Sequence, residues 1–206
     1  DGNTNAFFMA VEEVYNAQAG NQRALAGLGR EADTVGQEKA IIGKCIDVFK
    51  KLTGAPPKGW LSPVLAPTAE TERLIAEAGF LWYGDYNNID LPFVVNTKGG
   101  PLVAFPHTDF ADHRVLRANP RDWFEVYKDT FDYLYANEPN SLLNVTVHCH
   151  FGGRPLMAAQ VDRILKYLRG FPGVWFARHD ELAQWVKDNN IAEWTNQERL
   201  GPQNAR

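Results

Sequence analysis

Apolar residues recur along the chain with two different spacings, and these spacings predict its helices and strands. A repeat of three to four residues predicts helices that begin at Thr34, Thr68, Asn119, Pro155 and Asp180. Short β-branched and aromatic runs predict strands at 59–62, 80–83, 93–95, 102–105, 145–147 and 174–177. A polar loop is expected at 84–90 and a turn at 98–100. Helices and strands therefore alternate along most of the chain.

This alternation is typical of α/β proteins whose connections are short enough for right-handed crossovers. It predicts a parallel sheet or barrel built from residues 34–190, preceded by a poorly defined segment, 1–33, and followed by a polar tail, 191–206. Only four or five strands have a strong pattern, which is too few to close a barrel of seven or eight strands. We therefore expect either a small open sheet or the incomplete portion of a barrel.

The stretch from Leu142 to Glu181 contains the best candidate for chemistry. Its predicted strand stops at His148-Cys149-His150, just before a Gly-Gly turn and a helix. Side chains alternate along a strand, so the two imidazoles are expected to face the same side at the strand's carboxyl end. Active sites of parallel α/β folds are built at that end. Cys149 faces the other way under this interpretation, and a small buried side chain is favoured over a nucleophile.

Composition limits the classes of partner. The chain has 206 residues, of which 45% are apolar and 22% are charged, and its net charge is −4 without a Lys/Arg cluster. We therefore expect no nucleic-acid partner and no membrane partner. No apolar run approaches the roughly 20 residues that a bilayer span requires. Two cysteines without a CxxC pair favour a reducing compartment, and hence a cytoplasmic location.

Six segments, in this order, resemble parts of one enzyme family. They are Lys51–Gly54 (KLTG), Pro57–Pro63 (PKGWLSP), Ala76–Phe80 (AEAGF), Asp90–Phe93 (DLPF), His148–Pro155 (HCHFGGRP) and Gly173–Arg178 (GVWFAR). Together they resemble polysaccharide deacetylases of the chitooligosaccharide-deacetylase homology type, in the branch with cofactor-free allantoinases and peptidoglycan-deacetylase-like proteins. The resemblance covers about residues 34 to 187 and matches the later half of such proteins.

The resemblance implies a distorted (β/α) barrel of the polysaccharide deacetylase type, seen here as an incomplete C-terminal portion. It also implies hydrolysis of a non-peptide C–N bond, commonly an N-acetyl group on an amino sugar, and so a small-molecule or oligosaccharide substrate. In metal-dependent members one early aspartate is the general base, a second aspartate and two histidines hold a divalent metal, and a late histidine protonates the leaving amine. His148 matches that late histidine by position, and His150 is expected to assist it.

The chain departs from the family pattern at its start. The Thr-Phe-Asp-Asp motif that carries the two aspartates is missing, and the family's His-Gly segment survives only as Asp1-Gly2-Asn3-Thr4-Asn5. No metal ligand is therefore assigned, and a divalent metal such as zinc is expected only if the missing motif is supplied elsewhere. The chain is a fragment, one of two polypeptides, or a degenerate member. Because strands of the barrel are missing, we expect a second chain or a homo-oligomer.

Other polar and aromatic side chains are candidates for substrate binding. Trp60, Ser62 and Tyr86 fall on predicted loops after strands, where Trp60 either stacks on a sugar or belongs to the core. Arg154 either orients a substrate carbonyl or forms a salt bridge at the helix start. Asp85 is either a replacement carboxylate or a solvated loop residue. A metal at His107, Asp109 and His113 is the less favoured reading of that spacing.

The sequence thus predicts a hydrolase of non-peptide C–N bonds, most simply a deacetylase of polysaccharides or N-acetyl amino sugars, with His148 and His150 as catalytic residues. One alternative is a metal-free, allantoinase-like amidohydrolase that needs only polarising donors and an acid/base pair. Another is a non-catalytic carbohydrate-binding or scaffold protein that has lost the aspartates. A flavodoxin-like open sheet would need a phosphate-binding loop, which the sequence does not show.

Overall fold

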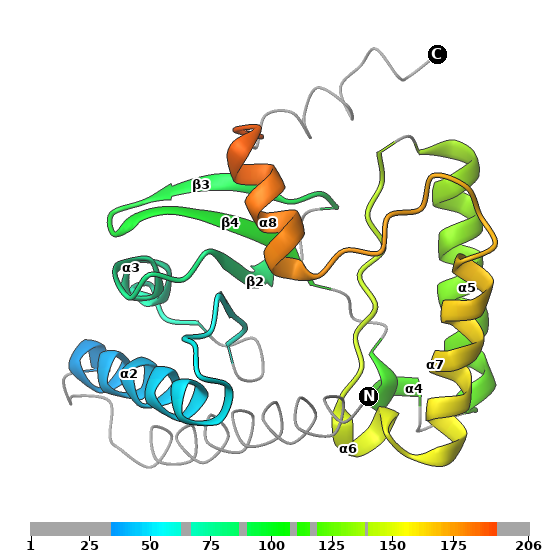
Figure 1. Ribbon diagram of the computed structural model, residues 1–206, viewed down its shortest axis with the longest axis horizontal. Coiled ribbons are helices and arrows are strands. Elements are labelled where there is room, and N and C mark those ends of the chain that lie inside the picture. The colour runs from blue at the N-terminus through cyan, green and yellow to red at the C-terminus, as the bar shows by residue number, and fades with distance from the viewer. Residues whose placement is uncertain are drawn as a thin grey trace. The chain divides into compact units, whose positions relative to one another are not determined.

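The computed structural model describes residues 34–62, 67–86, 90–107, 111–115, 119–138 and 140–192. These residues form two compact units, whose elements are labelled in Figure 1. The first unit takes the described residues up to Tyr86, the segment Pro92–Phe105 and the described residues from Arg178 onward. The second unit takes residues 90–91 and the described part of Pro106–Ala177. The first unit is therefore discontinuous in sequence.

In its described residues, the first unit contains a four-stranded sheet and three helices. Its helices are α2 (Thr34–Thr53), α3 (Thr71–Glu77) and α8 (His179–Asp188), and its strands are β1 (Gly59–Trp60), β2 (Trp82–Tyr86), β3 (Phe93–Thr97) and β4 (Gly100–Pro106). The strand order is β1-β2-β4-β3. β1 and β2 are parallel, whereas β3 and β4 form an antiparallel hairpin. The sheet is therefore mixed rather than all parallel.

Helices cover both faces of this sheet. Ile42 of α2 and Ile75 of α3 pack in one core cluster with Tyr83 of β2. The neighbouring residue Trp82 points the opposite way, as alternation requires, and stacks on His179 of α8 with ring centroids 4.8 Å apart. Buried Ala183 and Val186 of α8 complete the second face.

The start of α8 is held by charges as well as by rings. Asp180 accepts hydrogen bonds from Arg178 Nε at 2.9 Å and from Lys58 Nζ at 3.2 Å. These cations lower the pKa of the Asp180 carboxyl from 3.8 to about 2. Glu181 accepts the backbone N–H of Arg178, which satisfies one free donor at the helix start.

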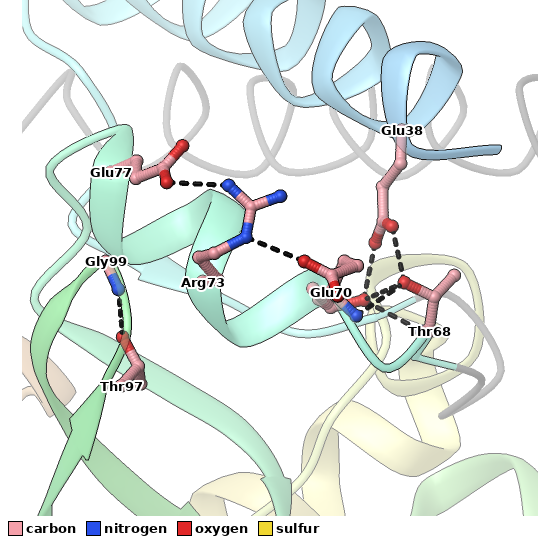
Figure 2. Close-up of polar contacts among 8 residues, drawn as sticks. Glu38, Thr68, Glu70, Arg73, Glu77, Thr97 and Gly99 are labelled. Carbon is pink, nitrogen blue, oxygen red and sulfur yellow. Dashed lines mark hydrogen bonds and ion pairs between the residues drawn. The ribbon is translucent and has the colours of Figure 1, made fainter. Parts of the chain in front are cut away.

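A polar network joins the amino-terminal ends of α2 and α3 (Figure 2). Glu38 of α2 accepts hydrogen bonds from the hydroxyls of Thr68 and Thr71, and Thr71 is fully buried. Arg73 on α3 pairs with Glu70 and Glu77. The buried hydroxyl of Thr71 is thus satisfied by a charged partner, which makes this contact costly to break.

The second unit is organised around two long helices. Its helices are α4 (Asp112–Val115), α5 (Pro120–Asn137), α6 (Cys149–Gly152) and α7 (Pro155–Leu168). Aromatic residues of α5, including Trp123 and Tyr127, pack against Met157 and Ile164 of α7. Asn119 caps α5 by accepting the N–H of Arg121, as the Asn-Pro order predicts.

Most of the predicted elements are confirmed, and the fold is α/β. The helices at 34, 155 and 180 begin within one residue of the prediction, and the hairpin turns at Lys98-Gly99. The helix expected from Thr68 begins at Thr71, because 68–70 form a preceding turn in which Thr68 Oγ1 accepts the N–H of Glu70.

The strands expected at 145–147 and 174–177 are wrong, since neither segment forms a strand in the part of the chain that the structure describes. A strand needs a backbone neighbour. The N–H of Thr146 is instead donated to the hydroxyl of Tyr127 at 3.0 Å, and the side-chain amide of Asn144 binds the carbonyl of Pro106. Side chains of the segments still face a core, because Val145 and Val174 pack against the α5–α7 cluster.

The hairpin tip at Gly99 provides a test of packing in the first unit. A Cβ at this position would meet the carbonyl of Arg73 and would lie 3.0 Å from the amide nitrogen of Glu77, both on α3. We expect Gly99→Ala to lower the free energy of unfolding by about 1–3 kcal/mol in urea denaturation. Gly43→Ala is the matched control, because a Cβ there meets nothing within 4 Å and alanine favours the helix by about 0.5–1 kcal/mol. Equal effects at the two positions would contradict the packing.

The ion pairs of Asp180 predict that part of the free energy of unfolding is lost in acid. Its folded pKa lies below its ordinary value, so this contribution to stability is complete above about pH 5 and is lost as the pH falls from 3.8 towards 2. We expect Asp180→Asn to lose less stability than the parent between pH 5 and pH 2.5, measured by urea unfolding. Asp162→Asn, which removes an exposed ion pair on α7, is the control. If Asp180→Asn lost as much stability in acid as the parent, the ion pairs of Asp180 would not be the source of the loss.

Candidate active site

A buried carboxylate and a histidine form the most distinctive polar pair in the second unit. Asp112, at the start of α4, has no exposed side-chain surface. Its Oδ2 accepts the backbone N–H of His148 at 2.6 Å, and its Oδ1 lies 2.6 Å from Nδ1 of the same residue. A carboxylate can only accept, so Nδ1 carries the proton in this pair. The side chain of His148 is 28% exposed, so its ring lies between the buried carboxylate and solvent.

The turn of α6 fixes the backbone of His148. Its carbonyl accepts the N–H groups of Phe151 at 3.1 Å and Gly152 at 2.6 Å. Its N–H is held by Asp112, so the N–H and the carbonyl of His148 are both hydrogen-bonded. The imidazole is therefore positioned from the backbone as well as through its ring.

His150 lies beside this pair, but not for the predicted reason. It belongs to α6 rather than to a strand, so strand alternation does not place the two imidazoles. Their ring centroids are nonetheless 5.9 Å apart, with the planes at 78°. His150 is exposed and packs against the Phe151 ring at 4.3 Å. Arg154 is exposed as well, and its Nε donates to the carbonyl of His150 at 3.3 Å.

The remaining predicted residues belong to the first unit. Trp60 and Ser62 are each 5% exposed, and Trp60 Nε1 donates to Ser62 Oγ at 3.1 Å. The N–H of Ser62 donates to Asp85 Oδ1 at 2.7 Å. Burial and the neighbouring Asp85 carboxylate raise the pKa of the Tyr83 phenol. Trp60, Ser62, Tyr83 and Asp85 thus form a polar cluster at the carboxyl ends of β1 and β2.

Trp60, Asp85 and Tyr86 lie in strands rather than in the loops that were expected to carry them. Trp60 is the last residue of β1, and β2 continues to Tyr86, so Asp85 and Tyr86 belong to a strand. Tyr86 donates its hydroxyl to Glu72 at 2.8 Å. The composition of Gly84-Asp85-Tyr86 suggested a loop. A strand can nevertheless contain polar side chains that find hydrogen-bond partners, as Asp85 does with the N–H of Ser62 and Tyr86 with Glu72.

Sequence reasoning missed Asp112. It lies on a helix of four residues, which is too short to produce a hydrophobic period, and it is 36 positions away from its partner. The only signal was its place close to His107, Asp109 and His113. Asp109 and the side chains of His113 and Cys149 lie outside the described residues, so the metal and nucleophile hypotheses for them stay predictions.

The described ranges do not supply a metal site of the family kind. Within them, no group of three or more His, Cys, Asp or Glu side chains could hold a metal ion. The described residues therefore do not fit that site, and no step below depends on a metal. Among the same residues, no helix has the length and apolar character needed to cross a bilayer.

Comparison with known proteins identifies what this architecture resembles. No protein-family profile matches the chain. A curated peptidoglycan deacetylase from Helicobacter pylori is 22% identical over 217 residues, which cover 85% of this chain and 70% of that protein. The crystal structure of a probable polysaccharide deacetylase from Pseudomonas aeruginosa PAO1 is 29% identical with a TM-score of 0.69, and that of PuuE allantoinase is 30% identical with a TM-score of 0.69.

The predicted resemblance to the polysaccharide deacetylase family is thereby confirmed. Each of those two structures covers 80% of the chain, and the chain spans 58% of their length. A putative polysaccharide deacetylase from Mycobacterium smegmatis has the same fold, with a TM-score of 0.70 at 20% identity. The α/β architecture predicted for a polysaccharide deacetylase is thereby confirmed over the matched part of the barrel.

The Asp112–His148 pair predicts a spectroscopic signature. With two carboxylate oxygens as acceptors, the neutral imidazole of His148 is expected to carry its proton on Nδ1. Asp112→Asn retains one acceptor and adds an amide donor, so it can no longer accept both N–H groups. We expect the population of the Nδ1–H tautomer to fall, measured by long-range ¹H–¹⁵N NMR at a pH where the ring is neutral. The other histidines in the same spectrum are the control, and an unchanged tautomer would contradict the pairing.

Proposed function

We propose that this chain is part of a hydrolase that removes acetyl groups from the amino sugars of a polysaccharide. The observation that carries the proposal is the Asp112–His148 pair, a partly exposed imidazole that a fully buried carboxylate orients through Nδ1. Support also comes from the curated relative and two of the solved structures, which are named as deacetylases. Peptidoglycan, named for the Helicobacter pylori protein, is the first polymer to test.

In the proposed reaction His148 is the general acid. Water oxygen adds to the amide carbon and its two protons pass to solvent, the C–N bond breaks, and the departing nitrogen takes a proton from Nε2 of the His148 imidazolium. Acetate and a free amino sugar result, and the neutral imidazole regains a proton from solvent. Asp112 keeps the ring in place and stabilises its charged form through Nδ1–H. The proposal assigns no described residue to the activation of water.

The residues beside His148 are proposed to bind the sugar. His150 and Arg154 are exposed and are linked to each other through the His150 carbonyl. An exposed guanidinium can donate two parallel hydrogen bonds to a carbonyl or carboxylate of the substrate. For Trp60, Ser62 and Tyr86 we propose a supporting role in substrate binding, because the first two are buried and the third is bonded to Glu72.

A ureide is the second substrate class to test, because PuuE allantoinase is among the matched structures. Both reactions break a C–N bond next to a carbonyl and both need a proton on the leaving nitrogen. The two classes are distinguished directly by assaying acetate release from acetylated sugar oligomers and ring opening of allantoin. A protein that binds acetylated sugars without turnover would support the non-catalytic alternative.

Replacing the proposed acid is the direct test. We expect His148→Gln to lower turnover of an acetylated sugar oligomer roughly 10²–10⁴-fold while binding, measured by calorimetry, changes little. Lys166→Gln, on the exposed side of α7, is the control and should keep parental turnover. Full turnover in His148→Gln would remove the residue from the reaction.

Assembly is proposed on separate grounds. Among the described strands, β1 lies at one edge of the sheet and has two residues, and an edge strand is a place where a further strand can pair. We expect native mass spectrometry of the purified protein to give a mass above that of the denatured chain, because a second chain or copy covers such an edge. A single chain in both spectra would contradict this expectation.

A further inference from the structure

We propose that Gly152 is a positioning residue for the Asp112–His148 pair, and that the absence of its side chain is what allows the pair to form. The catalytic part of this inference rests on the proposed function. The effect of Gly152 on the Asp112–His148 pair is argued from geometry alone. In the sequence, Gly152 is the first of two successive glycines between Phe151 and Arg154.

Gly152 is packed between Asp112 and Val147. It is buried, and its N–H donates to the carbonyl of His148 at 2.6 Å. A Cβ built on it would lie 2.9 Å from Oδ2 of Asp112 and would overlap a methyl group of Val147. Oδ2 is the same oxygen that accepts the backbone N–H of His148. A side chain at position 152 would therefore press on the carboxylate that holds the imidazole.

The two obstacles to a side chain differ in how easily they yield. Val147 is 39% exposed, so its methyl group has room to move towards solvent. Asp112 is fully buried and is bonded through both oxygens, so its carboxylate moves only by losing a bond to His148. A methyl group at position 152 is thus expected to act mainly through the carboxylate.

This expectation distinguishes positioning from ordinary packing. If Gly152 only fills space beside Val147, then shortening Val147 should relieve the effect of a methyl group. If Gly152 acts through Asp112, the same shortening should leave the effect in place, and removal of the carboxylate should abolish it. Contacting residues that share one function are expected to show such coupling in a double-mutant cycle.

The experiment compares the parent protein with Gly152→Ala, Val147→Ala, Asp112→Ala and the double variants Gly152→Ala/Val147→Ala and Gly152→Ala/Asp112→Ala. The first measurement is the tautomer of His148 by long-range ¹H–¹⁵N NMR, with its signal assigned from the spectrum of His148→Gln. We expect the Nδ1–H tautomer to be depleted in Gly152→Ala and to stay depleted when Val147 is also shortened. Retention of the parental tautomer in folded Gly152→Ala, or its recovery in the Val147 double variant, overturns the proposal.

The second measurement is turnover of an acetylated sugar oligomer. A displaced proton donor predicts a loss of roughly 10- to 100-fold in Gly152→Ala, mainly in kcat. In the Asp112→Ala background the same substitution should cost less than about twofold, whereas an equal loss in both backgrounds overturns the inference. If the parent has no turnover, the proposed function fails while the NMR result still decides the role of Gly152.

The same set of variants provides a control for effects on folding. If Gly152→Ala is too unstable for spectroscopy, urea unfolding of the variants replaces the NMR comparison. The destabilisation caused by Gly152→Ala should then shrink in the Asp112→Ala background and persist in the Val147→Ala background. The reverse pattern would assign Gly152 to packing against Val147. Gly43→Ala, with open space around its Cβ, reports the effect of a glycine-to-alanine change by itself.

Discussion

The burial of the Asp112 carboxylate is the constraint on which the organisation of the second unit depends. A buried charge costs several kcal/mol unless hydrogen bonds replace the water that it has lost. His148 provides two such bonds, one from its backbone and one from its ring. The chain must therefore bring residue 148 to α4 in one orientation. The turn into α6 starts from that point, because His148 also accepts the first hydrogen bonds of the turn.

The same requirement for backbone partners explains the segment before His148. Where no strand runs alongside, buried N–H groups still need acceptors. A tyrosine hydroxyl on α5 accepts one of them, and apolar side chains of the segment fill the α5–α7 core. The segment is thus fixed by side chains of helices rather than by a β-ladder. A polar end on an aromatic core residue lets Tyr127 serve both the core and the backbone.

The difference between predicted and observed structure follows from the range of the interactions involved. The long helices α2, α5 and α7 were predictable because an apolar stripe and residues typical of helix starts and ends lie within one segment. The runs at 145–147 and 174–177 have strand composition, but a strand also requires a neighbour that composition does not specify. His148 was predicted from its motif, whereas Asp112 was not, because their contact joins residues 36 positions apart. The polar cluster of Trp60, Ser62 and Asp85 depends likewise on the pairing of β1 with β2.

The discontinuity of the first unit has a consequence during synthesis. α8 covers one face of the sheet through His179, Ala183 and Val186, yet it is encoded after the whole of the second unit. On a ribosome that adds about 5–20 residues per second, the interval between Pro106 and Arg178 lasts roughly 4–14 s. During that time α8, whose His179 contacts Trp82 and Phe105 in the finished fold, has not been synthesised. The nascent chain therefore presents a hydrophobic surface that chaperones can bind before the final helix arrives.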